Sequence, residues 1–270
     1  MPRSNALTSL DGRFVIGHRG NAAHAPENTL ESFRQAAALG VDAIELDVRL
    51  TRDGVPVVIH DPTLGRTTDR GDVVADVSFA RLRRADAGAM FTPDAGATFP
   101  YRRRGLTVPT LREVVEATEG IPLLIEVKVP EVAPAIVDAL AHAGGSGRVV
   151  AASMQRDSVI PLREANLATG ASAMEVLSLW SLLIRRQPPR SLPYGALCIP
   201  RVYGGLPLPV VGLARLAREA GVATHVWTVD DPLVAERLWR AGIQGIVSND
   251  PGTILSVRAR LDAGLAGAAG

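Results

Sequence analysis

The chain has 270 residues, 47% of them hydrophobic and 21% charged, with a formal net charge of +1. This near-neutral balance excludes the basic footprint of a nucleic-acid-binding protein, and the single cysteine, Cys198, excludes an intrachain disulfide. No apolar run approaches the roughly 18 residues of a membrane span, and the first residues lack the apolar core of a signal peptide, so we predict a cytoplasmic protein.

The sequence predicts alternating strands and helices along the chain. Nine runs have the composition of strands, at residues 14–18, 42–50, 55–60, 121–128, 148–153, 171–177, 195–200, 223–229 and 242–248. Helical patterns separate most of them, and Gly40 and Gly120 mark helix ends. This alternation favours a (β/α)8 TIM barrel over a doubly wound sheet. Nine runs are one too many, so we expect that either 171–177 or 195–200 is not a barrel strand.

Two segments interrupt this alternation. Residues 61–109 are polar, rich in glycine and arginine, and too long for a connecting turn. We therefore predict a single domain over 1–270, with a small subdomain inserted at about 61–109 after the third strand. Residues 176–186 are apolar but too short to span a bilayer, which favours a core helix and leaves peripheral lipid contact as the alternative.

Polar side chains end or interrupt the first four predicted strands. They are His18 on the first, Glu45 and Asp47 on the second, His60 on the third, and Glu126 and Lys128 on the fourth. Because side chains alternate along a strand, the two residues of each i, i+2 pair share a face. The C-terminal ends of the strands form the rim where TIM-barrel enzymes place their active sites. We therefore predict one polar cluster at this rim.

Two carboxylates on one strand face repel each other and are costly to bury, unless a cation lies between them. Glu45, Asp47 and Glu126 provide three carboxylates without a thiol, which favours Mg²⁺ or Ca²⁺ over zinc. Together with a dication, Arg19 and Lys128, their formal charges sum to one positive charge. A phosphodiester anion would neutralise it. The pattern therefore predicts a divalent metal site that binds a phosphate ester.

His18 and His60 complete the predicted cluster, because imidazole is the side chain best matched to proton transfer near neutral pH. Cleavage of a phosphodiester needs a base for the attacking hydroxyl or water and an acid for the leaving alkoxide. The metal and Arg19 would stabilise the charge that develops on the phosphoryl oxygens. The sequence leaves open which histidine is the base, and whether water or the substrate's own hydroxyl attacks.

Seven motifs resemble those of the glycerophosphodiester phosphodiesterase family and follow the family's order. They are GHRG at 17–20, APENT at 25–29, IELDV at 44–48, DGVPVVIHDPTLGRTT at 53–68, VPTLREVV at 108–115, IEVK at 125–128 and VWTVDD at 226–231. The resemblance covers nearly the whole chain. It implies a phospholipase-C-like barrel with an insertion after the third strand, a divalent metal, and hydrolysis of glycerophosphodiesters to glycerol 3-phosphate and an alcohol.

The same resemblance implies roles for individual residues. The catalytic pair would be His18 and His60, the phosphate ligands Arg19 and Lys128, and the metal ligands Glu45, Asp47 and Glu126. Substrate contacts are expected from Glu27, Asn28 and Trp227. The chain departs from the family at Ser248 and Asn249, where a Thr-Asp pair is common.

Some of these residues have structural alternatives. Asn28, with Glu31 three residues later, also matches the N-cap of a helix. Trp227 either fills the barrel or packs against glycerol. We expect Asp61 to orient a loop rather than His60, since neighbours along a strand point in opposite directions.

Two other functions remain open. A phospholipase D-like enzyme acting on lysophospholipids is favoured by the apolar run at 176–186, and it would prefer micellar lysophosphatidylcholine to glycerophosphocholine. A catalytically inactive barrel used as a binding module is the alternative of another class. The histidines and acids argue against it, because unpaired buried carboxylates are costly. In each case the expected partner is a small molecule rather than a nucleic acid.

Overall fold

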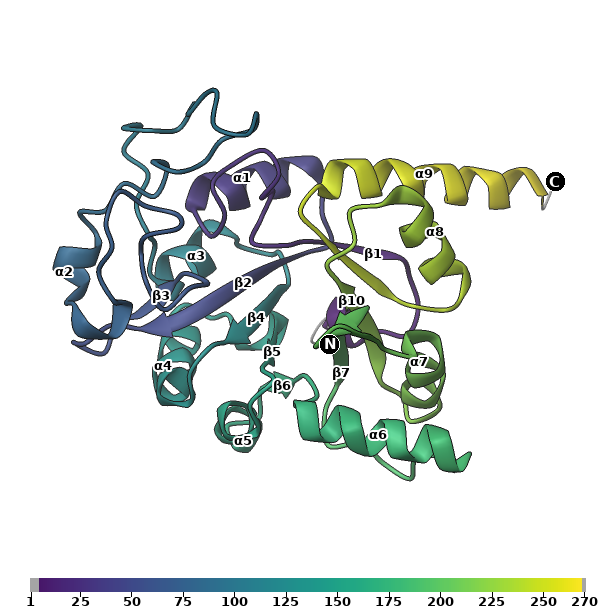
Figure 1. Ribbon diagram of the computed structural model, residues 1–270. Coiled ribbons are helices and arrows are strands. Elements are labelled where there is room, and N and C mark those ends of the chain that lie inside the picture. Colours follow the sequence, from purple (N-terminus) through teal and green to yellow (C-terminus); the bar gives the residue numbers. More distant parts are fainter. Residues whose placement is uncertain (1–4, 269–270) are drawn as a thin grey trace.

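The computed structural model describes residues 5–268, in which eight parallel strands form a barrel with helices around it (Figure 1). Residues 1–4 and 269–270, which the predicted domain 1–270 includes, lie outside the described residues. The barrel strands are β1 (Phe14–Gly17), β2 (Ala43–Leu50), β4 (Leu123–Val127), β5 (Val149–Ala152), β6 (Ala168–Thr169), β7 (Ala196–Pro200), β10 (Ala223–Trp227) and β11 (Gly245–Ser248). Around the barrel they follow the order β6, β5, β4, β2, β1, β11, β10, β7.

The barrel closes between β6 and β7. The amide of Gly195 donates to the carbonyl of Thr169 at 2.9 Å, and the amide of Ala171 donates to the carbonyl of Ala196 at 3.0 Å. Gly170 and Ala196 form a parallel bridge between these bonds. The predicted TIM barrel is therefore confirmed, and this short contact joins the two ends of its sheet, β6 and β7.

Helices cover the outside of the barrel. They are α1 (Leu30–Leu39), α3 (Leu111–Ala117), α4 (Ala133–His142), α5 (Arg156–Glu164), α6 (Ala173–Arg185), α7 (Val210–Glu219), α8 (Pro232–Arg240) and α9 (Pro251–Ala268). Short 3₁₀ turns are η1 (Ala6–Thr8), η3 (Pro130–Val132) and η4 (Ser146–Arg148). Local sequence sets the helix ends: the Thr29 hydroxyl accepts from the amide of Ser32 at the start of α1, and Gly40 ends α1 with φ 80°.

The predicted strand run 55–60 contains β3 (Pro56–Val58), which is not a barrel strand. β3 pairs antiparallel with the outer half of β2, with Val58 opposite Val48. β2 runs past the rim of the barrel, and a turn at Gly54, with φ 79°, returns the chain as a hairpin. The predicted insertion would therefore follow the third strand in chain order but only the second strand of the barrel.

The expected choice between 171–177 and 195–200 is only half right. Residues 195–200 contain β7, whereas most of 171–177 belongs to α6. The missing barrel strand is β6, which has two residues and precedes the predicted run. Two residues are too few to show a period of two, so the pattern gave no signal for β6.

The barrel interior changes from apolar at its base to polar at its C-terminal rim. Along β2, Ile44 and Leu46 pack outward against the helices, whereas Glu45 and Asp47 face the inside. The base is filled by Leu7, Ile16, Ala43, Leu124, Val150, Ala196 and Val247. The i, i+2 spacing of the acids therefore places them above an apolar plug.

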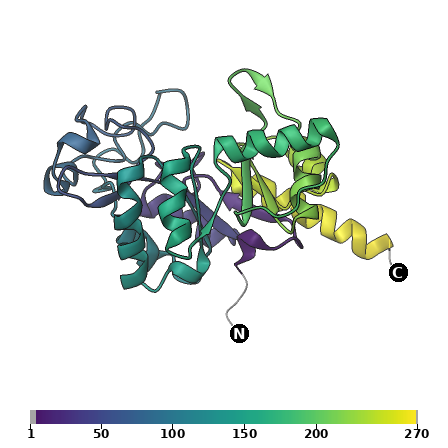
Figure 2. The ribbon, with the colours of Figure 1, turned by 90° about the horizontal axis from the view of Figure 1, so that it is seen from below.

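Residues 61–109 have features of a small subdomain. They contain η2 (Val74–Asp76) and α2 (Phe79–Leu82). Their apolar side chains form a separate cluster with β3, made of Val57, Ile59, Leu64, Val74, Val77, Leu82, Ala85, Ala87 and Val108. Figure 2 shows this segment, in blue, beside the barrel. A subdomain inserted at about 61–109 stays a prediction.

The apolar run at 176–186 forms most of α6. Val176 and Leu179 are buried against the neighbouring elements, as expected of a core helix. Leu177 and Ile184, however, are 52% and 73% exposed. Within residues 5–268, we find no helix with the length and hydropathy needed to cross a bilayer.

His225 lies inside the base of the barrel on β10, and its pKa couples stability to pH. The side chain is fully buried, and Nε2 donates to the carbonyl of Leu7 at 2.7 Å. Burial lowers the pKa of His225 from 6.5 to about 4. As the pH falls from 6.5 to 4, the unfolded chain therefore binds a proton that the folded protein does not. The free energy of unfolding therefore decreases as the pH falls through this window. We expect the total decrease to be about 3 kcal/mol.

Urea unfolding at a series of pH values tests this expectation. His225→Gln is the matched variant, because its side-chain amide keeps a donor for Leu7 but does not titrate. The unfolding free energy of the variant should fall less steeply than that of the wild type over the same window. Equal slopes for the two proteins would contradict the coupling.

Candidate active site

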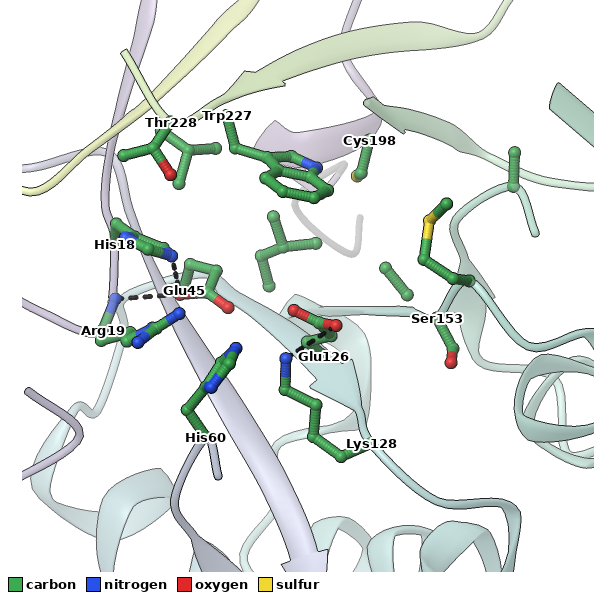
Figure 3. Close-up of a pocket in the computed structure, with 15 residues that line it drawn as sticks. His18, Arg19, Glu45, His60, Glu126, Lys128, Ser153, Cys198, Trp227 and Thr228 are labelled. Carbon is green, nitrogen blue, oxygen red and sulfur yellow. Dashed lines mark hydrogen bonds and ion pairs between the residues drawn. The ribbon is translucent and has the colours of Figure 1, made fainter. Parts of the chain in front are cut away.

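One cavity at the C-terminal rim brings together six of the seven residues predicted for catalysis, phosphate binding and metal binding (Figure 3). They are His18, Arg19, Glu45, His60, Glu126 and Lys128. His60 reaches this cavity from the β2–β3 hairpin, which corrects the expectation that four consecutive barrel strands contribute. A seventh predicted residue, Asp47, is fully buried beside the cavity.

The three predicted metal ligands lie together. Glu45, Asp47 and Glu126 each offer a carboxylate oxygen, and these oxygens lie within 4.8 Å of one another. Glu45 accepts a hydrogen bond from the backbone amide of Arg19 at 2.9 Å. Burial raises the pKa of Glu45 well above its ordinary value, and Asp47 and Glu126 raise it further. Ionisation of Glu45 is therefore unfavourable without an additional cation.

Asp47 already has cationic partners. The ammonium of Lys128 lies 2.9 Å from Asp47 Oδ1 and 2.8 Å from Glu126 Oε1. Arg19 Nε lies 3.2 Å from Asp47 Oδ2. Burial opposes the ionisation of Asp47, but Lys128 and Arg19 outweigh it and hold its pKa below the ordinary value. Lys128 thus bridges two carboxylates of the cluster.

Asn28 supports Asp47 and does not cap a helix. Its side-chain amide donates to Asp47 Oδ2 at 2.8 Å, and its Oδ1 accepts from the Asp47 amide at 3.3 Å. The N-cap of α1 is Thr29, so the alternative cap assignment is wrong by one residue. Asn28 is 3% exposed and lies behind the cavity lining. We infer that it positions Asp47.

His18 is oriented by a neutral partner. Its Nδ1 lies 2.7 Å from Asn249 Oδ1, and the side-chain amide of Asn249 donates to Asp230 at 2.8 Å. The bond to Asp230 fixes which way the Asn249 amide faces, so His18 Nδ1 must be the donor. Burial, followed by the nearby Arg19, lowers the pKa of His18. Neutral His18 therefore carries its lone pair on Nε2, which lies 3.9 Å from Glu45 Oε2.

His60 is oriented by a charged partner. Its Nδ1 lies 2.6 Å from Asp61 Oδ1, so the expectation that Asp61 does not orient His60 is wrong. The alternation rule fails here because β3 ends at Val58, before this pair. Burial opposes the ionisation of Asp61, but hydrogen bonds from Arg66 and His60 lower its pKa to about 2. Asp61 therefore presents a carboxylate to the imidazole.

The opposite wall of the cavity is apolar (Figure 3). Trp227 and Cys198 lie there, together with Leu124, Ala152, Met154, Ala171 and Val247. Trp227 is therefore placed where it can contact a bound molecule. Glu27 lies outside this lining, where Arg19 donates to it at 2.7 Å and Arg66 donates to both of its oxygens.

Comparison with known proteins identifies the family. Residues 18–253 match the Glycerophosphoryl diester phosphodiesterase family. A glycerophosphodiester phosphodiesterase of Caldanaerobacter subterraneus is 30% identical, over 90% of this chain and 96% of its own length. This chain belongs to the glycerophosphoryl diester phosphodiesterase family. A further member, from Bacillus subtilis, is 28% identical over 91% of this chain and 86% of its own length.

Solved structures of glycerophosphoryl diester phosphodiesterases share the fold. An Oleispira antarctica phosphodiesterase in complex with the product sn-glycerol-3-phosphate is 27% identical, with a TM-score of 0.75, over 91% of this chain and 96% of that one. The protein is therefore an enzyme, a phosphodiesterase, and the alternative of an inactive binding barrel is set aside.

In this glycerophosphoryl diester phosphodiesterase, the hydrogen-bond partners of the two histidines were not predicted from the sequence. Asp61 adjoins His60 in the sequence, so the dipeptide itself was an available signal. Asn249 and Asp230 are far from His18 in the sequence, and only the meeting of the ends of β10, β11 and β1 brings them together. The departure from the family's Thr-Asp pair thus falls on the residue that orients His18.

Proposed function

We propose that this phosphodiesterase hydrolyses glycerophosphodiesters, such as glycerophosphocholine or glycerophosphoethanolamine, to glycerol 3-phosphate and an alcohol, with the help of a divalent metal. The observation that carries the proposal is the meeting of two imidazoles, two side-chain cations and a carboxylate cluster at one cavity. The Oleispira phosphodiesterase, whose structure holds the product sn-glycerol-3-phosphate, supports this substrate class.

Glu45, Asp47 and Glu126 would hold the metal. All three donors are carboxylate oxygens within 4.8 Å of one another, which fits a hard dication such as Mg²⁺ or Ca²⁺. The raised pKa of Glu45 supports this fit, because burial and the neighbouring Asp47 and Glu126 make its negative charge unfavourable unless a cation binds. When bound, the metal would polarise the phosphoryl group and stabilise negative charge on its oxygens.

Arg19 and Lys128 would bind the phosphate. Both line the cavity, and their side chains are only 16% and 10% exposed. A charged hydrogen bond to phosphate is stronger in such a sheltered place than in open solvent. Both cations are also held by Asp47, so their charges are in position before the substrate binds.

The hydrogen bonds of the two imidazoles support different roles. His18 donates Nδ1–H to the neutral Asn249, and its unprotonated Nε2 would accept the proton of the attacking hydroxyl or water. His60 instead donates Nδ1–H to the Asp61 carboxylate rather than to a neutral amide. Its Nε2–H would protonate the leaving alkoxide. We therefore assign His18 as the base and His60 as the acid.

A product assay tests the function. Purified protein with glycerophosphocholine is expected to release glycerol 3-phosphate and choline in equal amounts. Chelation should stop the reaction, and added Mg²⁺ or Ca²⁺ should restore it, because the metal supplies positive charge to the phosphoryl group. Glycerol 3-phosphate can be followed with its dehydrogenase. Release of phosphocholine instead would contradict the bond assignment, and turnover undiminished by chelator would contradict the metal.

A second candidate, phospholipase D-like cleavage of lysophospholipids, is favoured by the apolar wall around Trp227, against which an acyl-bearing substrate could pack. The two candidates differ in substrate preference. Faster turnover of micellar lysophosphatidylcholine than of glycerophosphocholine, at equal concentrations of substrate, would establish the second.

A further inference from the structure

A hairpin on the catalytic rim exposes apolar side chains. β8 (Val202–Tyr203) and β9 (Leu206–Pro207) follow barrel strand β7 and pair only with each other in the described part of the chain. Val202, Tyr203 and Leu206 are 54%, 53% and 67% exposed. Figure 2 shows the hairpin, in light green, rising clear of α6 and of the barrel.

The hairpin is apolar on both of its faces. Val202 pairs with Pro207, and Tyr203 pairs with Leu206. Adjacent pairs of an antiparallel ladder point to opposite faces, so each face carries apolar side chains. A two-stranded ribbon in water is marginally stable and gains nothing from exposing such groups. A flat protein surface would cover one face, whereas the interfacial layer of a bilayer surrounds both.

The surrounding segment is strongly basic. Residues 176–218 contain six arginines and no aspartate, glutamate or lysine, although the whole chain has a net charge of only +1. All six arginines are exposed, and over residues 5–268 five of them have no carboxylate partner within 4.0 Å; these five are Arg185, Arg186, Arg190, Arg201 and Arg215. This concentration of unpaired positive charge indicates an anionic partner.

We propose that this region, the rim patch, docks on the surface of an anionic phospholipid bilayer. The rim patch comprises hairpin residues 201–207, the exposed α6 side chains Met174, Leu177 and Ile184, and the exposed arginines Arg185, Arg186 and Arg190. A bilayer offers acidic headgroups to the arginines and an apolar interior to the hairpin. A symmetric dimer through the same patch would place arginines against arginines, which disfavours a second copy as the occupant.

Docking through the rim patch brings the cavity close to the bilayer. The hairpin directly follows β7, whose Cys198 belongs to the cavity wall. The rim patch is nevertheless separate from the residues assigned to chemistry. Lipid binding and turnover of a water-soluble diester are therefore independent measurements, and the docking proposal stands or falls without the proposed function.

Vesicle sedimentation tests the proposal with the full chain. Wild-type protein is expected to sediment with phosphatidylglycerol vesicles and not with phosphatidylcholine vesicles, and to dissociate as salt screens the arginines. The triple variant Val202→Ser, Tyr203→Ser, Leu206→Ser should lose at least about tenfold in apparent affinity. The double variant Arg185→Glu, Arg201→Glu should lose at least about 25-fold in apparent affinity, because each arginine removed accounts for roughly fivefold.

Matched controls lie away from the rim patch. Leu39→Ser changes a leucine that is 43% exposed at the end of α1, beside the start of α9 and outside the rim patch. Arg237→Glu, Arg260→Glu makes the same change in charge on α8 and α9. Both controls should bind phosphatidylglycerol vesicles within about twofold of the wild type. Turnover of glycerophosphocholine without vesicles should be unchanged in all variants, which shows that they are folded.

Three outcomes would overturn the proposal. Wild-type protein that stays in solution with phosphatidylglycerol vesicles has no such docking surface. Binding that survives either rim-patch variant, or that falls equally in the controls, does not use these residues. Concentration-dependent dimerisation that the triple variant abolishes, without vesicle binding, would assign the patch to a second copy of the chain.

Discussion

Replacing His18 or His60 with alanine is expected to lower kcat for glycerophosphocholine by about 10²- to 10⁴-fold, the usual contribution of a positioned acid or base. KM should change little, because neither imidazole is assigned to hold the substrate before the reaction. His142→Ala is the matched control, since His142 is 59% exposed on α4. Steady-state kinetics and unfolding curves of the three variants measure these effects.

The same variants distinguish the acid from the base. A glycerophosphodiester whose alcohol is p-nitrophenol has a leaving group that departs with little help from an acid. His60→Ala should therefore recover much of its lost rate with this substrate, whereas His18→Ala should stay slow. Recovery by His18→Ala alone would reverse the assignment, and full activity of either variant with glycerophosphocholine would remove that histidine from the mechanism.

Glu45→Gln is expected to abolish turnover and yet leave the metal-free protein as stable as the wild type, or more stable. Loss of one of three metal-binding carboxylates should lower activity at saturating substrate by at least about 10²-fold. The gain in stability follows from the raised pKa of Glu45, because glutamine removes a buried negative charge that Asp47 and Glu126 oppose. Thermal unfolding in chelator and activity with added metal measure both effects.

Asp47→Asn provides the contrast, because the carboxylate of Asp47 is stabilised by its partners. Lys128 and Arg19 would lose the charge that they share, and breaking such a buried pair typically costs about 3–5 kcal/mol. Asp47→Asn should therefore lower the unfolding temperature in chelator. If both substitutions destabilise the protein equally, the charge of Glu45 is not unfavourable in the way that distinguishes it from the ion-paired charge of Asp47.

Much of this site followed from strand periodicity. The alternation of strands and helices predicted the barrel, and the i, i+2 acids of β2 predicted an inward face, because a strand allows only two side-chain directions. The same rule placed Glu126 and Lys128 at the rim beside them. These predictions needed only short-range geometry, together with the general position of active sites in barrels.

The remaining features depended on information that periodicity lacks. A strand pattern does not give direction, so β3 resembled a barrel strand although it returns antiparallel along β2. The rule of opposite neighbours does not apply beyond a strand end, which is why Asp61 was misassigned. Asn249 meets His18 only because β11 pairs with β1, and no local pattern encodes a contact across 231 positions.

Lys128, between Asp47 and Glu126, gives the newly made polypeptide its own counter-ion. The acids can be enclosed with the ammonium among them, so folding on the ribosome need not wait for a metal. Under the proposed function, the metal ion would then replace the Lys128 ammonium among the carboxylates rather than enter a site without a cation. Such competition would lower the affinity for the metal ion. The fraction of enzyme with metal bound would then depend on the concentration of that ion.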